Sequence, residues 1–249
     1  NIGKKFVALD LRADADRDRF LELARTADVV LTNLKPGALD RLGVGPVELR
    51  SRFPRLVFCS ISGFGLAGDS RPALDTVVQA EAGLMSLVAD GTRPVRIGVS
   101  IADQVAAHAA PLAVLAALAW RDREGCGGLI DLSMLDVATW LTELTWPSGQ
   151  SAFRPWARLE AGDGWIMVDA TAADVHEVRC DAGDACNRGE LADAFLRRGF
   201  RAVPVREMDE VFMHPAVKSR SLVRFIGPDG EAVPVLRSPH RLSAEPPDY

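Results

Sequence analysis

The chain has 249 residues, of which 48% are hydrophobic and 25% charged, and this composition excludes a disordered, collagen-like or coiled-coil protein. Its formal net charge of −5 lacks the basic surplus that binding to a phosphate backbone requires, so nucleic acid is not the expected partner. The four cysteines fit neither a zinc-ligand spacing nor a disulfide framework, which indicates a reduced, cytoplasmic protein without a metal site. The chain begins at Asn1 without a leader segment, and we expect upstream sequence to be missing.

The first part of the chain alternates short apolar runs with an amphipathic stretch. Residues 6–10 predict a strand, residues 15–26 a helix with its apolar side chains on one face, and residues 29–32 a second strand. Another apolar run at 56–62 predicts a third strand. Strands that alternate with helices through brief loops are typical of βαβ units, so we predict a parallel sheet with helices packed on it.

A glycine-rich loop at 63–72 follows, and its glycine spacing matches neither the dinucleotide-binding fingerprint nor the P-loop. Residues 74–88 then predict a helix. The stretch 105–120 is almost continuously apolar but shorter than the roughly 20 residues of a membrane span. We therefore expect a buried helix and no membrane segment. His108 is expected to be a core histidine, and a proton-shuttling role is its less favoured alternative. Residues 125–136 predict a glycine turn, a strand and the start of a helix.

The chain changes character after a stretch rich in proline, glycine and tryptophan, which predicts a linker that begins at Pro147. Beyond it, residues 162–170 predict a strand, and residues 189–198 and 206–212 predict helices. Residues 222–236 predict a hairpin around a Pro-Asp-Gly turn. The second half of the chain is therefore expected to form a small α+β domain.

Several segments, in their order along the chain, resemble the class III CoA-transferase family, which includes formyl-CoA and carnitine CoA-transferases and belongs to the α-methylacyl-CoA racemase superfamily. These segments are NIGKKFVALDLR (1–12), ADVVLTNLKPGALDRLGVG (27–45), PRLVFCSISGFGLAG (54–68), GVSIADQ (98–104) and GCGGLIDLSMLDVA (125–138). The resemblance implies an α/β fold with a Rossmann-like large domain at 1–146, whose N-terminal strand and helix are missing here. It further implies a linker at 147–160, a shortened small domain and return segment at 161–249, and an interlocked homodimer.

The resemblance implies an enzyme that transfers coenzyme A from an acyl-CoA to a carboxylate acceptor. Asp103 matches the family's catalytic aspartate, which forms a mixed anhydride and then an aspartyl-CoA thioester. An aspartate just before an apolar helix is also a common N-cap, so Asp103 is expected to act as the nucleophile, as a cap, or as both. Asp75 matches an acidic position near the catalytic aspartate. Backbone N–H groups of the glycine-containing loops and the helix N-terminus are expected to stabilise the oxyanion.

Coenzyme A enters as a substrate, and no tightly bound cofactor is implied. Asn33, Leu34 and Arg41 match family positions that contact CoA, and Arg12 matches a position that often carries a basic residue for a CoA phosphate. A guanidinium group suits phosphate because it offers paired N–H donors. The alternative for both arginines is a solvated surface charge without a ligand.

Two other functions stay open at this point. One is α-methylacyl-CoA racemisation, which is disfavoured because racemase-like members carry histidine where this chain has Leu74, and leucine cannot accept a proton. The other is a non-catalytic CoA-transferase-like module of a larger polypeptide or assembly. The missing upstream segment and the shortened small domain favour such a module, whereas the aspartate at position 103 opposes it.

Overall fold

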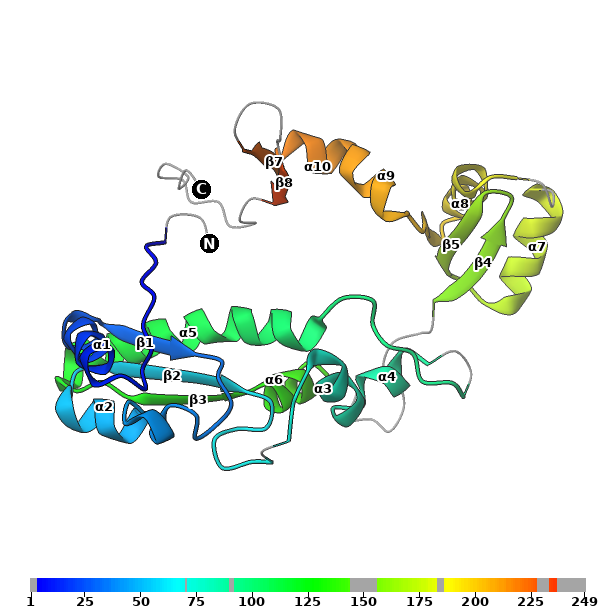
Figure 1. The fold of residues 1–249 in the computed structure, drawn as a ribbon. Helices are drawn as coiled ribbons and strands as arrows, with labels where there is room; N and C mark the ends of the chain where they lie inside the picture. The colour runs from blue at the N-terminus through cyan, green and yellow to red at the C-terminus, as the bar shows by residue number, and fades with distance from the viewer. Residues whose placement is uncertain are drawn as a thin grey trace. The chain divides into compact units, whose positions relative to one another are not determined.

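A computed structural model describes residues 4–69, 71–89, 92–143, 156–182, 186–227 and 233–236. The chain divides into two compact units (Figure 1). The large unit comprises residues 6–150, and the small unit comprises residues 151–249 together with residues 1–5. The expected linker at 147–160 falls mostly on residues outside the described part of the chain.

The large unit is built on a three-stranded parallel sheet. Strands β1 (Val29–Thr32), β2 (Val57–Ser62) and β3 (Leu129–Ser133) pair in the order β1-β2-β3. The central strand β2 is buried along nearly its whole length, as expected of a parallel strand covered on both faces. The prediction of a parallel α/β sheet is therefore confirmed.

Helices cover both faces of this sheet. α5 (Ile101–Glu124) lies along one face and α2 (Pro46–Arg52) against the other (Figure 1). Alternation along β2 sends Phe58 into a core with Leu49 of α2, and Ile61 into a second core with Ala102 and Ala106 of α5. The remaining helical elements of the large unit are α1 (Asp14–Thr26), η1 (Asp40–Leu42), α3 (Asp75–Glu81), α4 (Leu84–Leu87) and α6 (Met134–Trp140).

Two predicted elements differ in the structure. Residues 6–10 form no strand, and Phe6 is 78% exposed, because an apolar run becomes a strand only where a neighbouring strand satisfies its backbone groups. The single helix expected at 74–88 is two short helices, α3 and α4. Gly83 separates them with a φ of 74°, a left-handed conformation that ends a helix and that glycine adopts without a Cβ clash.

α5 is longer and less buried than the sequence predicts. Its buried residues are Ala102, Ala106 and Ala110, whereas Leu112 and Leu115 are 70% and 63% exposed, so the expectation of a buried helix is wrong. By length and composition alone, α5 is the one helix in the described part of the chain apolar enough to cross a membrane. Core helices of soluble proteins pass the same test, so this property alone assigns no membrane role.

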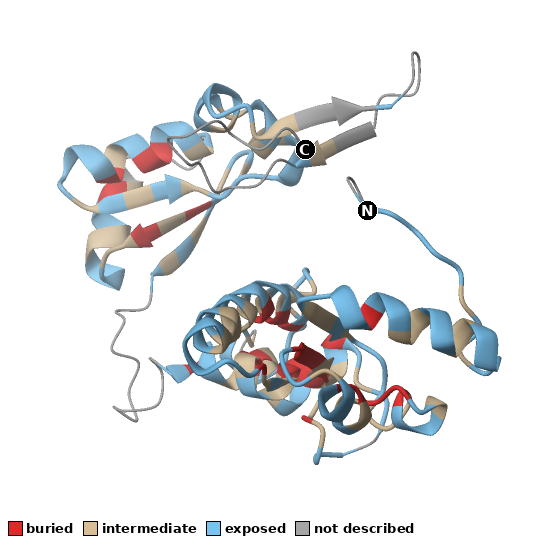
Figure 2. Cartoon of the chain, turned by 90° about the vertical axis from the view of Figure 1, so that its left-hand side faces the viewer, coloured by how far each residue is buried: buried red, intermediate tan, exposed pale blue. Residues whose placement is uncertain are grey.

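The small unit contains a three-stranded antiparallel sheet in the order β4-β5-β6. One face packs against two helices through Ile166, Val168, Leu191 and Phe195, and buried residues lie inside each unit (Figure 2). Its elements are β4 (Ala157–Ala161), β5 (Gly164–Asp169), α7 (Ala172–Ala182), α8 (Arg188–Arg197), β6 (Arg201–Pro204), α9 (Met208–Met213), α10 (Pro215–Ser219), β7 (Val223–Ile226) and β8 (Val233–Leu236). β7 and β8 pair antiparallel, which confirms the predicted hairpin, while its turn lies outside the described residues.

Candidate active site

Asp75 and Asp103 come from the starts of two helices that pack together in the large unit. Asp75 is the first residue of α3 and is 6% exposed, whereas Asp103 is the third residue of α5 and reaches solvent. The N-cap of α5 is Ser100, so Asp103 lies inside the first turn and the alternative capping role for it is wrong. The structure thus brings together the two carboxylates that the sequence singles out, 28 positions apart in the chain.

Asp75 caps α5 from a neighbouring helix. Its Oδ1 accepts the backbone N–H of Ala102 at 2.9 Å, and its Oδ2 accepts the side-chain amide of Gln79 at 2.7 Å. The Arg96 Nη2 lies 3.6 Å from the same Oδ2. A buried carboxylate needs such partners because leaving it unpaired costs several kcal/mol, about 3–5 when one partner of a buried pair is removed.

Partial burial raises the pKa of the Asp103 carboxyl, and the negative charge of Asp75 raises it further. Both causes disfavour the ionised form of Asp103, which makes its carboxylate a stronger base and nucleophile than an ordinary surface aspartate once ionised. Carboxyl groups with perturbed pKa values that sit beside a charged partner are typical of catalytic sites. The pair is therefore a candidate functional site.

The first turn of α5 offers few free N–H groups to an anion. Ile101 N–H donates to the Val99 carbonyl at 2.9 Å, and Gln104 N–H donates to the Ser100 carbonyl at 3.0 Å. The Ala102 N–H is held by Asp75. The expectation that this helix N-terminus stabilises an oxyanion is thus weakened, since these three amides already have protein partners.

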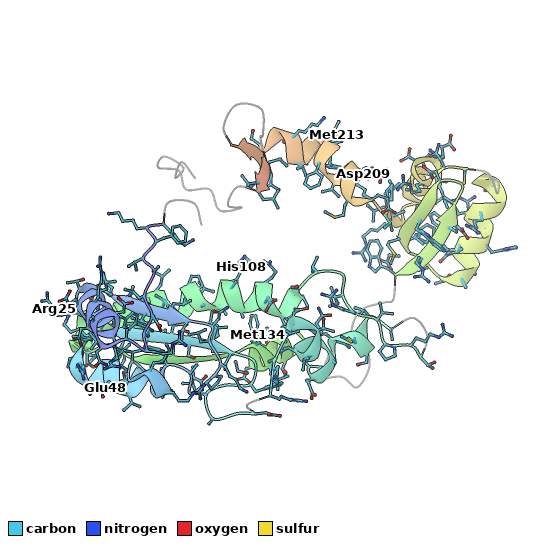
Figure 3. The ribbon with its side chains drawn as sticks, in the orientation of Figure 1. Arg25, Glu48, His108, Met134, Asp209 and Met213 are labelled. Atoms are coloured by element: carbon cyan, nitrogen blue, oxygen red, sulfur yellow. The ribbon has the colours of Figure 1, made fainter. Side chains whose placement is uncertain are left out.

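His108 lies on the side of α5 opposite Met134, facing away from the sheet (Figure 3). It is exposed, and its Nδ1 lies 2.6 Å from the Gln104 carbonyl oxygen one turn earlier. The expectation of a core histidine is therefore wrong. A helix face cannot be assigned to the core from an apolar run alone, because residues on every face of that run are apolar.

A small hollow lies where β1 and β2 end, the edge at which open parallel sheets bind ligands. Its lining comes from the loop after β1, from β2 and from the glycine-rich loop, and comprises Thr32, Leu34, Lys35, Pro36, Gly37, Leu39, Asp40, Pro46, Phe58, Ser60 and Leu66. Leu34 thus lies in the hollow as a wall residue. Asn33 is exposed next to it, and Arg41 of η1 lies over Gly37, where an added Cβ would meet its Nη1 at 3.4 Å.

Arg12 is not part of this hollow. Its guanidinium group makes two hydrogen bonds to Asp10, at 2.8 and 3.0 Å, and the side chain is 81% exposed. These bonds lower the pKa of the Asp10 carboxyl. The position of Arg12 in the structure fits a surface ion pair, and its role towards CoA stays a prediction.

The glycine-rich loop after β2 is held by a residue that the sequence analysis missed. Both carboxylate oxygens of Asp131 on β3 lie 3.0 Å from the Leu66 backbone nitrogen. Gly65 beside it has a φ of 84°, so the loop needs glycine there. Gln79 was missed as well, although its spacing of four residues from Asp75 places both on one helix face.

Within the described residues, no group of three or more histidine, cysteine, aspartate or glutamate side chains could hold a metal ion. The candidate site comprises the carboxyl pair at the start of α5 and the hollow at the ends of β1 and β2.

A family model described as CoA-transferase family III matches residues 1–185. The chain belongs to CoA-transferase family III. The probable fatty acyl-CoA transferase Rv3272 of Mycobacterium tuberculosis is 40% identical over 144 residues, which cover 57% of this chain and 36% of that protein. A succinyl-CoA:mesaconate CoA-transferase of Haloarcula hispanica is 28% identical over 299 aligned residues, covering 99% of this chain and 75% of that protein.

A solved structure shows the same fold. The crystal structure of Rv3272 in its orthorhombic form has a TM-score of 0.83 and 28% sequence identity, and the match covers 97% of this chain and 78% of that chain. The matched part of this chain thus spans 36% of the length of Rv3272 in the sequence alignment and 78% in the structural alignment, and 75% of the length of the Haloarcula hispanica enzyme.

Proposed function

We propose that the protein transfers coenzyme A from an acyl-CoA to a carboxylate acceptor, with Asp103 as the covalent nucleophile. The observation that carries the proposal is the carboxyl pair, in which Asp103 reaches solvent beside the buried Asp75. Membership of CoA-transferase family III supports the reaction class.

The Asp103 carboxylate attacks the thioester carbonyl, and the bond to sulfur breaks to give an acyl-aspartyl anhydride and the CoA thiolate. The thiolate then attacks the aspartyl carbonyl, which releases the donor as a carboxylate and leaves an aspartyl-CoA thioester. An acceptor carboxylate repeats the two steps in reverse. The energy of the thioester is conserved throughout, because no step transfers the acyl group to water.

The environment of Asp103 suits these steps. Its raised pKa increases the basicity of the attacking carboxylate. For oxyanion stabilisation we propose the backbone of the glycine-rich loop, since three amides at the start of α5 already have protein partners. Racemisation is disfavoured because Leu74, directly before Asp75, cannot carry a proton.

For binding of CoA we propose the hollow at the ends of β1 and β2. Leu34 would contact the apolar part of the ligand, while Asn33 and Arg41 would reach its polar groups. Arg12 would join them by exchanging its bonds to Asp10 for a phosphate.

We also propose a homodimer. The outer face of α5 leaves Leu112, Leu115 and Trp120 more than half exposed, and apolar side chains gathered on one surface are typical of interfaces. Sedimentation of the full chain at several concentrations tests this state. A single monomeric species at all concentrations would contradict it.

The nucleophile is tested with Asp103→Asn and a matched control, Asp122→Asn, which makes the same change near the far end of α5. Wild type and control are expected to gain a hydroxamate at Asp103 after incubation with an acyl-CoA and then hydroxylamine. The Asp103→Asn protein should gain none, because an amide does not attack a thioester. Turnover by Asp103→Asn would refute the assignment, and an unmodified wild type would instead favour the non-catalytic module.

The CoA hollow is tested with Arg41→Ala, and Arg50→Ala on α2 is the control. Loss of a charge-assisted hydrogen bond predicts weaker binding of desulfo-CoA by about 1–3 kcal/mol for Arg41→Ala. Calorimetric titration gives both affinities. Equal affinities would return Arg41 to the role of a surface charge.

A further inference from the structure

Three side chains of α3 hold the segment that leads into α5. The Arg96 Nε donates to Thr76 Oγ1 at 2.9 Å, Gln79 bonds to the backbone of residues 97 and 99, and Asp75 accepts from Ala102. This segment ends one residue before Asp103. Its hydrogen bonds therefore determine where the first turn of α5 begins relative to α3.

Gln79 occupies the centre of these contacts and is completely buried. Its Nε2 donates to Asp75 Oδ2 at 2.7 Å and to the Val99 carbonyl at 3.1 Å, and its Oε1 accepts the Ile97 N–H at 3.0 Å. The NH₂ group of this amide thus donates two hydrogen bonds, and its oxygen accepts the third. A glutamate could not donate these bonds, and an apolar side chain could make none of them.

We infer that Gln79 is a positioning residue of the reaction, which fixes the Asp75 carboxylate and the segment before α5 so that Asp103 is held at the site. This inference rests on the proposed function, because it assigns Gln79 a part in the reactivity of Asp103. Gln79 itself touches neither the substrate nor the reacting atoms. It acts through the side chain of Asp75 and through the backbone that precedes Asp103.

The geometry explains how a polar side chain is accommodated at this buried position. A leucine would fill the same space without the requirement for three partners, and a buried amide with a missing partner is costly. The partners of Gln79 lie in α3 itself and in the segment that leads from α4 into α5. Two of them are backbone groups of the segment, and the third is the carboxylate whose charge acts on Asp103.

Loosening this set of contacts should change Asp103 itself. Burial and the nearby Asp75 charge both raise the pKa of the Asp103 carboxyl, and Arg96 is the cation held beside the pair. If the segment separates from α3, water enters and Asp75 is no longer held in place. Both causes then weaken, and the pKa of Asp103 should fall towards its ordinary value.

The test compares Gln79→Leu with Glu81→Leu, a control on the same helix that loses an exposed hydrogen bond to Arg71. Single-turnover labelling of Asp103 by an acyl-CoA gives a rate constant and a half-saturating concentration. Gln79→Leu is expected to lower the rate constant at least tenfold and to leave the half-saturating concentration within twofold, because the CoA hollow is not altered. The control should match wild type in both.

Gln79→Glu provides a second variant of unchanged shape, which keeps the comparison available if Gln79→Leu does not fold. A neutral glutamic acid can donate one hydrogen bond and accept another, whereas the ionised form cannot donate. Its labelling rate should therefore decline as pH rises through ionisation of the new carboxyl.

A carboxyl ¹³C NMR titration of Asp103 supplies a readout that does not need catalysis, with the signal assigned by its loss in Asp103→Asn. The titration midpoint should fall in Gln79→Leu and stay at the wild-type value in Glu81→Leu. If wild type itself is never labelled, the proposed function fails and the titration alone decides the positioning role. An unchanged midpoint in folded Gln79→Leu overturns the inference, whatever the activity.

Discussion

Replacing Asp75 by asparagine should destabilise the large unit, although the two side chains have nearly the same shape. In wild type, both carboxylate oxygens accept hydrogen bonds, one from Ala102 and one from Gln79. Asparagine keeps one oxygen, which can still accept the Ala102 N–H. Its NH₂ group then faces the NH₂ group of Gln79, and two donors cannot bond to each other. Gln79 cannot turn its oxygen towards position 75 without losing the Ile97 N–H.

The cost follows from these contacts. Loss of a hydrogen bond to a charged acceptor accounts for about 1.5–3 kcal/mol. The ion pair with Arg96, which is 44% exposed and 3.6 Å from Asp75, adds at most about 1 kcal/mol. We therefore expect Asp75→Asn to lower the free energy of unfolding of the large unit by about 1.5–4 kcal/mol near neutral pH.

Urea unfolding, monitored by hydrogen exchange in peptides that cover β2, measures the free energy of unfolding of the large unit separately from that of the small unit. Asp122→Asn serves as the control, because Asp122 is 68% exposed and its ion-pair distances are 3.6 and 4.0 Å. The control should lie within about 0.5 kcal/mol of wild type. An Asp75→Asn value equally close to wild type would refute the claim that this carboxylate holds α5.

Three further changes test other parts of the structure. Because the pKa of Asp103 is raised in the folded state, its ionisation destabilises wild type at neutral pH, and Asp103→Asn should be the more stable protein there. This gain in stability should vanish as the pH falls below 3.8, the ordinary pKa of aspartate. A stability difference that does not change with pH would contradict the raised pKa. Gly65→Ala should lower the free energy of unfolding, measured by thermal denaturation, by about 1–2 kcal/mol because Gly65 has a φ of 84°. Gly98→Ala, with open space around the added methyl group, should leave stability unchanged, and equal melting temperatures of the two variants would show that the loop adapts. Arg188→Leu should lower the melting temperature of the small unit above about pH 5, because hydrogen bonds from Arg188 lower the pKa of Glu210. The difference in melting temperature from wild type should narrow as the pH falls through that lowered pKa. A difference that widens on acidification would show that this ion pair does not stabilise the small unit.

The parallel sheet could be predicted from the sequence because its strands are short apolar runs separated by helical stretches. β2 and β3 needed only this local pattern. Residues 6–10 carry the same pattern and form no strand, since pairing depends on a partner elsewhere in the chain. Local composition therefore predicts which residues can form a strand, while tertiary contacts decide whether they do.

In the candidate site, too, some residues could be predicted from the sequence, whereas others are recognised only in the structure. Asp103 could be found from the motif around it, but the partner that caps its helix, Asp75, is 27 positions from the capped residue. Gln79 follows Asp75 at helical spacing, yet a glutamine in a helix is ordinary, and only the structure shows that it is completely buried. The ion pair of Arg12 could be predicted from the sequence, because its partner Asp10 is only two residues away.

α5 approaches the rest of the large unit through alanines. Ala102 and Ala106 pack with Val78 and Met134, so the helix backbone comes close to its neighbours with only methyl groups between them. A larger side chain at either alanine would push the helix outward, and a shift of 1 Å is enough to misplace a reacting group. The inner face of α5 therefore has almost no steric tolerance, and the accuracy with which Asp103 is placed depends on the small size of Ala102 and Ala106.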